Sequence, residues 1–166
     1  MASTKEKITA TALALFAQRG YDGVSVRDIC KQVGIKESSL YYHFPSKHAI
    51  LTTLLSHFEN RAAEGMAQLE QALGDQQGPW GQVSYRMVCQ AFFEGYLMDP
   101  FCNQVLRLLQ MEQFHNPDLG EIYERWMFRV PLAFQGRMFT ALVDLGLLHP
   151  ATGEDLAVAF YGPIHL

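Results

Sequence analysis

Cysteine is scarce in this sequence, and its few cysteines are not spaced for bonding. The three residues, Cys30, Cys89 and Cys102, are odd in number and form no C-x-x-C pair. Such usage is typical of reduced thiols in a cytoplasmic protein rather than of a disulfide framework. The chain also lacks the apolar core of a secretion signal and any apolar run near the roughly 18 residues that cross a membrane. We therefore expect a cytoplasmic protein with no membrane partner.

Motifs for catalysis are missing as well. There is no H-x-x-x-H pair and no glycine-rich phosphate loop. Glu112 and His115 share a helical spacing, but no third partner for a catalytic site accompanies them. The sequence thus predicts neither an enzyme nor a bound metal or cofactor.

Lysine is absent after position 47, and the net charge differs in sign between the two parts of the chain. The protein as a whole has a net charge of −4, which by itself argues against binding to nucleic acid. Residues 1–47, however, carry seven basic and four acidic side chains, whereas residues 48–166 carry six basic and thirteen acidic ones. The net charges are therefore +3 and −7. A basic head on an acidic body indicates that the head binds a polyanion.

Apolar residues recur at helical spacing along the whole chain, and no stretch alternates as a β-strand does. The pattern predicts an all-α protein. Helices are expected near the N-terminus over 3–20, 25–33 and 36–43, followed by a long fourth helix over 46–73. After a break rich in Gly and Gln, further helices are expected over 81–97, over 100–113, over 117–145 with a kink at Pro131, and from about 154.

The segment from about residue 25 to residue 44 has the pattern of a helix, a tight turn and a second helix. Gly34 supplies the positive φ that such a turn requires. In a helix-turn-helix the second helix enters the major groove of DNA, so its surface needs short polar side chains. Ser38 and Ser39 meet that need where a buried helix would carry Leu or Val.

Candidate DNA contacts surround this second helix. Lys36 has the chemistry to bind guanine O6 and N7, and Glu37 to accept a hydrogen bond from cytosine N4. The pair Tyr41 and Tyr42 offers hydroxyl donors, although one of the two rings could instead cover a small core. Helix N-termini attract phosphate, so the flanking helices contribute as well. The candidate set is Ser25, Arg27, Lys36, Glu37, Ser38, Ser39, Tyr41, Tyr42, His43 and Lys47.

Residues from about 7 to 54 resemble the DNA-binding domain of the TetR (TetR/AcrR) family of transcriptional regulators. The resemblance rests on segments that stay in register: Ile8…Ala12-Leu13…Phe16, Gly20-Tyr21, Ser25-Val26-Arg27-Asp28-Ile29, Val33-Gly34-Ile35 and Leu40-Tyr41-Tyr42-His43-Phe44-Pro45-Ser46-Lys47. It implies phosphate contacts from Tyr42, His43 and Lys47. It also implies base or backbone contacts from residues 36–41.

The resemblance further implies the domain organisation and the function. Residues 1–47 would form a three-helix helix-turn-helix domain, joined by the long fourth helix to a helical ligand-binding and dimerisation domain over 48–166. The expected protein is a homodimeric, ligand-responsive repressor that binds a palindromic operator in double-stranded DNA. A small apolar or aromatic effector in the body would release the operator.

The chain departs from the family pattern at two places. The family usually has Ser then Lys where this chain has Lys36-Glu37, so the N-cap of the second helix is lost and the base preference does not transfer. The final helix is shorter than the family's, which supplies half of the dimer interface. We therefore expect a body that is truncated at its C-terminus.

Aromatic residues and methionines of the body form a candidate effector pocket, since such side chains suit an adaptable apolar cavity. The expected lining residues are Met87, Phe92, Phe93, Tyr96, Phe114, Tyr123, Trp126, Met127 and Phe134. The other interpretation is that they form ordinary core. The neighbouring Glu112, Arg125 and Arg129 would orient a ligand or form surface ion pairs.

Two other functions fit the sequence. A helical protein-interaction module would dock a protein with its head and use the body as a plain core. A DNA-binding regulator without a small-molecule effector would keep the head and need no cavity.

Overall fold

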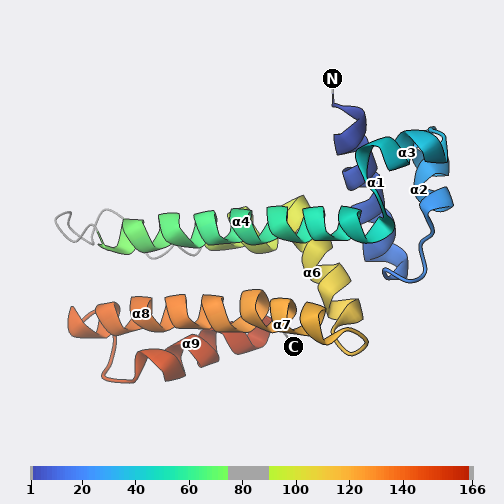
Figure 1. Cartoon of the computed structure of the whole chain (residues 1–166). Coiled ribbons are helices and arrows are strands. Elements are labelled where there is room, and N and C mark those ends of the chain that lie inside the picture. The colour runs from blue at the N-terminus through green and yellow to red at the C-terminus, as the bar shows by residue number, and fades with distance from the viewer. Residues whose placement is uncertain (1, 75–89, 165–166) are drawn as a thin grey trace.

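The computed structural model describes residues 2–74 and 90–164, and every element in these ranges is helical. Three helices form a head at one end of the long helix α4 (Lys47–Gly74), and the other helices form a body along its length (Figure 1). The all-α prediction is confirmed. The predicted helix over 81–97 lies largely outside the described residues. None of the described helices is long and apolar enough to cross a membrane.

The helices of the head agree with the predicted bounds to within one residue. They are α1 (Thr4–Arg19), α2 (Val26–Val33) and α3 (Glu37–His43). Each contributes one apolar face to a common core, whose fully buried members include Ile8, Phe16, Ile29 and Leu40. The short α2 and α3 therefore depend on α1 for the surface against which they pack.

Capping boxes begin the first two helices. The Ser3 hydroxyl accepts from the amide of Glu6, and the Glu6 carboxylate accepts from the amide of Ser3. Ser25 and Asp28 repeat the arrangement at α2. Each box satisfies two amides that the helix itself leaves without partners.

Helix α4 is shared between the head and the body. Its 28 residues span about 42 Å at 1.5 Å per residue. Ile50 and Leu54 are buried near its N-terminus, where it contacts α1, and Phe58, Ala62 and Met66 are buried further along, where it contacts the body. One continuous backbone thus takes part in both cores.

The body is built from helices that pack beside α4, with α8 running along it and α9 against α8 (Figure 1). In chain order they are the π-helical turn η1 (Phe93–Leu97), α6 (Pro100–Glu112), α7 (Pro117–Glu124), the π-helical turn η2 (Arg125–Arg129), α8 (Val130–Asp144), α9 (Gly153–Tyr161) and a 3₁₀ turn (Gly162–Ile164). Among the residues that the structure describes, three ion pairs connect α4 to this layer: Arg61–Asp99, Glu59–Arg125 and Glu70–Arg137.

Proline 131 explains why the predicted helix over 117–145 is divided. Proline has no amide hydrogen, so neither the carbonyl four residues back, on Met127, nor the one five residues back, on Trp126, receives a bond from it. Both carbonyl oxygens instead accept hydrogen bonds from tyrosine side chains of other segments. The Tyr161 hydroxyl donates to the Met127 oxygen at 2.6 Å, and the Tyr96 hydroxyl donates to the Trp126 oxygen at 2.5 Å. Burial raises the pKa of both phenols, so both remain protonated donors.

We predict that Tyr161→Phe destabilises the protein by about 1–3 kcal/mol, because it leaves a carbonyl without a donor in a part-buried site. Pro131→Ala supplies a new amide donor at that turn, so Tyr161→Phe should cost less in the Pro131→Ala background. Urea unfolding of the wild type, both single variants and the double variant measures the difference. Equal costs in the two backgrounds would show that the tyrosine does not compensate for the proline.

Candidate nucleic-acid interface

The turn between α2 and α3 has the geometry that the sequence predicts. Gly34 adopts φ 79° and ψ 36°, a left-handed conformation, and its amide donates to the carbonyl of Cys30. After the turn α3 is held from beneath by Leu40, which is fully buried, and by Phe44. The opposite face of α3 is left to solvent.

That outward face gathers most of the predicted DNA contacts. Tyr42 is 85% exposed and Tyr41 50% exposed, so neither ring covers the core. His43 is half-buried, and its ring lies 5.1 Å from that of Tyr42 in an edge-on arrangement. A shallow groove of about 480 Å³ follows this face and is lined by Thr4, Ile35, Ser38, Ser39, Tyr42 and His43.

At the start of α3, the two residues that depart from the family pattern behave differently. Lys36 is the N-cap and makes no side-chain capping bond, which confirms that the cap is lost. Its side chain is exposed. Glu37 instead turns toward α2, where its Oε1 accepts from Nε of Arg27 at 3.0 Å.

The Ser25 side chain forms hydrogen bonds within its own helix, α2. Its hydroxyl accepts from the Asp28 amide at 3.2 Å and donates to the Asp28 carboxylate at 2.5 Å. The hydrogen bonds from the Ser25 side chain and backbone lower the pKa of Asp28. A carboxylate therefore already lies at the N-terminus of α2, where a phosphate was expected.

Lys47 is held by the turn between α1 and α2. Its Nζ donates to the carbonyl oxygens of Tyr21 at 2.8 Å and of Val24 at 2.9 Å, and it lies 4.0 Å from the centre of the Tyr21 ring. One of its three N–H groups is left for a further acceptor. The ammonium thus fixes the first turn of α4 against the head as well as adding charge.

The body holds the same residue, Tyr21, at its backbone amide. The Tyr21 amide donates to Glu112 Oε1 at 2.8 Å, across 91 positions of sequence. Gly20 makes room for this contact, because a Cβ at that position would lie 2.8 Å from the carboxylate oxygen. The sequence interpretation considered Glu112 as a ligand group or a surface pair and missed this contact. Glycine at position 20 was the one local signal of a close approach.

Most of the predicted effector-pocket residues form one buried aromatic cluster, two lie partly buried at its edge, and one lies apart from it. Phe92, Tyr96, Tyr123, Trp126 and Phe134 are buried, and Phe93 and Met127 are partly buried against them. Phe58 of α4 lies at the centre, 6.3 Å from Tyr96 and 6.2 Å from Trp126 between ring centroids. Phe114, by contrast, is 87% exposed at the turn after α6 and does not join this cluster. Met87 lies outside the described residues.

A groove of about 490 Å³ opens beside this cluster, between α4 and the segment that leads into η1. Phe92 and Tyr96 form part of its floor. Its α4 wall carries both apolar and charged side chains: Arg61, Ala62, Glu64, Gly65, Met66, Gln68 and Leu69.

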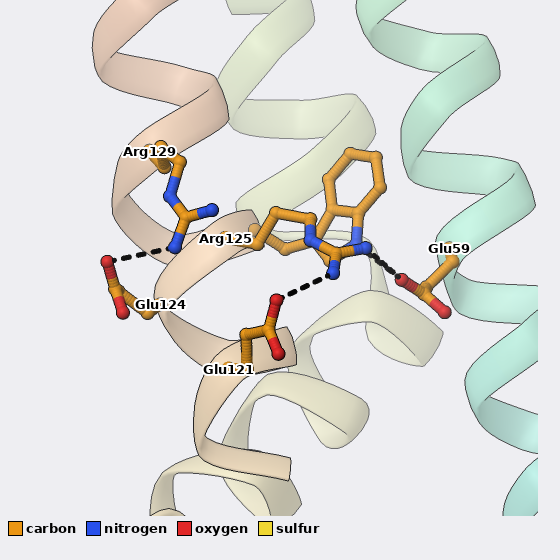
Figure 2. Close-up of polar contacts among 6 residues, drawn as sticks. Glu59, Glu121, Glu124, Arg125 and Arg129 are labelled. Carbon is orange, nitrogen blue, oxygen red and sulfur yellow. Dashed lines mark hydrogen bonds and ion pairs between the residues drawn. The ribbon is translucent and has the colours of Figure 1, made fainter. Parts of the chain in front are cut away.

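The arginines next to the aromatic cluster are paired with carboxylates. Figure 2 shows Arg125 between Glu59 of α4 and Glu121, each at 3.2 Å, and Arg129 against Glu124 at 3.1 Å. Glu59 also accepts from Nε1 of Trp126 at 3.1 Å. The ion-pair interpretation of these two arginines is therefore the one the structure supports.

Titratable groups do not gather into a metal site within the described ranges. No three His, Cys, Asp or Glu side chains there could hold an ion together. Cys102 is buried, and that burial raises the pKa of its thiol to about 12, so it is an unreactive core residue.

Comparison with known proteins agrees with the geometry of the head. Residues 8–54 match the family described as bacterial regulatory proteins, tetR family. These residues run from the buried start of α1 to the part of α4 that completes the core of the head. Residues 8–54 of this chain are therefore a TetR-family domain. That family consists of regulators rather than enzymes. This agrees with the sequence-based prediction that the protein is not an enzyme.

The curated relatives match over part of their length only. IcaR of Staphylococcus aureus, a negative transcriptional regulator of the biofilm operon icaADBC, is 54% identical over 46 residues, 28% of this chain and 25% of IcaR. YuxN of Bacillus subtilis (strain 168), an uncharacterized HTH-type transcriptional regulator, is 33% identical over 94 residues, 56% of this chain and 31% of YuxN. The chain thus aligns with between a quarter and a third of the length of these relatives.

Solved structures extend the likeness to the body, as fold alone. A TetR-family regulator from Marinobacter aquaeolei VT8 has a TM-score of 0.67 at 24% identity, over 98% of this chain and 75% of that one. The reduced form of E. coli NemR has a TM-score of 0.61 at 19% identity, over 96% of this chain and 82% of that one. The whole described helical arrangement is therefore that of the TetR fold.

The contact between Glu112 and Tyr21 generates a prediction for the junction of head and body. Glu112→Ala should speed hydrogen exchange at the Tyr21 amide and destabilise the protein by about 1 kcal/mol, because the amide loses its acceptor. Glu112→Gln is the matched control, since its amide oxygen can still accept the bond. Exchange that is equally slow in all three proteins would mean that the bond does not protect the amide.

Proposed function

We propose that the protein is a DNA-binding transcriptional regulator whose head binds a palindromic operator. The observation that carries the proposal is the outward face of α3, where small hydroxyls and exposed aromatic side chains lie on the only basic part of an acidic chain. Such a face has no role in the core of the head. It supplies the short side chains and donors that a groove-reading helix needs.

Residues 1–47 are the DNA-binding domain in this proposal, and residues 48–166 are the ligand-binding and dimerisation domain. Two copies form a homodimer in the cytoplasm and place their α3 helices in successive major grooves, about 34–36 Å apart. IcaR is named as a negative regulator, so repression is the favoured direction.

A small apolar or aromatic effector releases the operator in the same proposal. The groove between α4 and η1 offers such a molecule the rings of Phe92 and Tyr96. From there α4 leads directly to the head, and α6 leads to it through Glu112 and the Tyr21 amide. An effector that binds one arrangement of these helices more tightly shifts the population of head orientations. Effector and operator then weaken each other's binding by the same factor.

A regulator without a small-molecule effector is the second candidate. It is favoured by the packing of the predicted pocket residues against one another, for example Phe92 against Tyr96 at 5.6 Å between ring centroids. A thermal-shift screen with apolar and aromatic compounds separates the two candidates. A compound that binds only the folded protein raises its melting temperature, and an effector must also weaken operator binding.

Selection of bound DNA from a random pool, followed by gel-shift titration over a range of salt concentrations, tests the proposal as a whole. We expect a palindrome to emerge and its affinity to fall as salt rises, because bound phosphates release counterions. Binding that is absent, or that shows no preference among sequences, would leave the head as a protein-docking module.

Tyr42 provides a clean test of the α3 face because its side chain is almost fully exposed. Tyr42→Phe removes only the hydroxyl, so the melting temperature should not change. Affinity for all DNA sequences should fall by about threefold to tenfold through the loss of one hydrogen bond to phosphate. If operator affinity stays the same, the Tyr42 hydroxyl does not touch DNA.

Lys47→Ala should weaken binding to all sequences alike and lower the slope of log affinity against log salt by about one. Because Lys47 also donates to Tyr21 and Val24, the melting temperature should fall as well. The two measurements separate its roles. A lower melting temperature with an unchanged salt slope would make Lys47 a structural residue only.

A further inference from the structure

Arg27 of α2 and Glu37 of α3 form an ion pair across the helix-turn-helix. Nε of Arg27 donates to Oε1 of Glu37 at 3.0 Å, and the two side chains are 85% and 44% exposed. Ion pairs this exposed contribute little to stability. The pair joins the two helices at the N-terminal end of α3, which approaches the bases in the proposed function. Its effect is therefore expected in DNA binding rather than in stability.

The ion pair uses Nε of Arg27 and not the terminal Nη groups. Glu37 takes the Nε hydrogen, and within the described residues both terminal Nη groups of Arg27 donate to no protein acceptor. Those Nη groups are the fork with which arginine binds two acceptors at once. A carboxylate on Nε therefore fixes the direction of the guanidinium and keeps its fork free.

The charge of Glu37 also favours a role in holding Arg27 rather than in contacting DNA directly. An unpaired carboxylate on a surface that meets phosphates would be repelled by DNA, and Lys36, the basic neighbour of Glu37, makes no ion pair with it among the described residues. Paired with Arg27, the carboxylate is neutralised and the two residues add no net charge. Such a pair contributes little to non-specific affinity, which depends on net positive charge.

We propose that Glu37 is a positioning residue that orients Arg27, and that Arg27 reads a guanine through O6 and N7 in the major groove. The inference rests on the proposed function. It replaces two sequence-based interpretations, in which Glu37 itself contacts cytosine and Lys36 contacts guanine. The reading group then comes from the first helix of the helix-turn-helix, and the recognition helix supplies its support.

The experiment measures affinity for the selected operator and for versions with each base pair of one half-site substituted. The proteins are the wild type, Arg27→Ala, Arg27→Lys, Glu37→Gln and the double variant Arg27→Ala with Glu37→Gln. Arg27→Ala should abolish discrimination at one G·C pair, a loss of about tenfold to hundredfold. Arg27→Lys should lose most of it despite its charge, because lysine has no fork.

Glu37→Gln should reduce discrimination at the same base pair by a smaller factor, because its amide oxygen still accepts from Nε of Arg27 but holds the guanidinium more weakly than a carboxylate does. The double variant should match Arg27→Ala alone, because a support has no effect once the supported group is gone. Melting temperatures should be unchanged in all variants. Lys31→Gln is the matched control, since it removes an exposed charge from the same helix, and it should alter no single base-pair preference.

Three results would overturn the inference while leaving the proposed function intact. The first is a Glu37→Gln effect at a different base pair from Arg27→Ala. The second is additive losses in the double variant. The third is uniform weakening of all sequences by Arg27→Ala, which would assign Arg27 to phosphate. A wild-type protein that selects no sequence overturns the proposed function itself, and the inference with it, before any variant is measured.

Discussion

The rest of the structure depends on the double burial of α4. Its N-terminal turns contribute Ile50 and Leu54 to the core of the head, and its middle contributes Phe58, Ala62 and Met66 to the body. A helix is stiff along its axis, so the two cores cannot shift independently without bending it. The molecule therefore consists of two packed units that share one helix, and their relative placement is fixed in part by that helix.

A second connection joins the units at the backbone of Tyr21. Lys47 holds the carbonyl of this residue from the α4 side, and Glu112 holds its amide from the body side. Neither contact is a large source of stability, since each replaces a hydrogen bond to water. The two hydrogen bonds matter because they fix the position of the backbone. They set where the turn between α1 and α2 lies relative to α4, and hence where α3 points.

Much of the fold follows from local sequence, and the exceptions have identifiable causes. The caps at Ser3 and Ser25, the turn at Gly34 and the missing cap at Lys36 were all predictable. The π-helical turns were not, because periodicity does not distinguish 3.6 residues per turn from a single wider turn. Pro131 correctly marked the irregular place, but the tyrosines that fill the freed carbonyls come from other helices. Phe114 was assigned to the aromatic cluster on composition alone, and composition does not report which way a turn faces.

The sequence by itself determined the helix boundaries of the head, its basic charge and the polar outward face of α3, because each depends on residues within a few positions of one another. A capping box joins residues three apart, and a charge imbalance needs no structure at all. Tertiary structure alone decided which groups hold that face in place. The bond from Tyr21 to Glu112 spans 91 positions, and the pairing of Arg27 with Glu37 depends on the angle between two helices. Such contacts are set by how the cores pack, which no local pattern encodes.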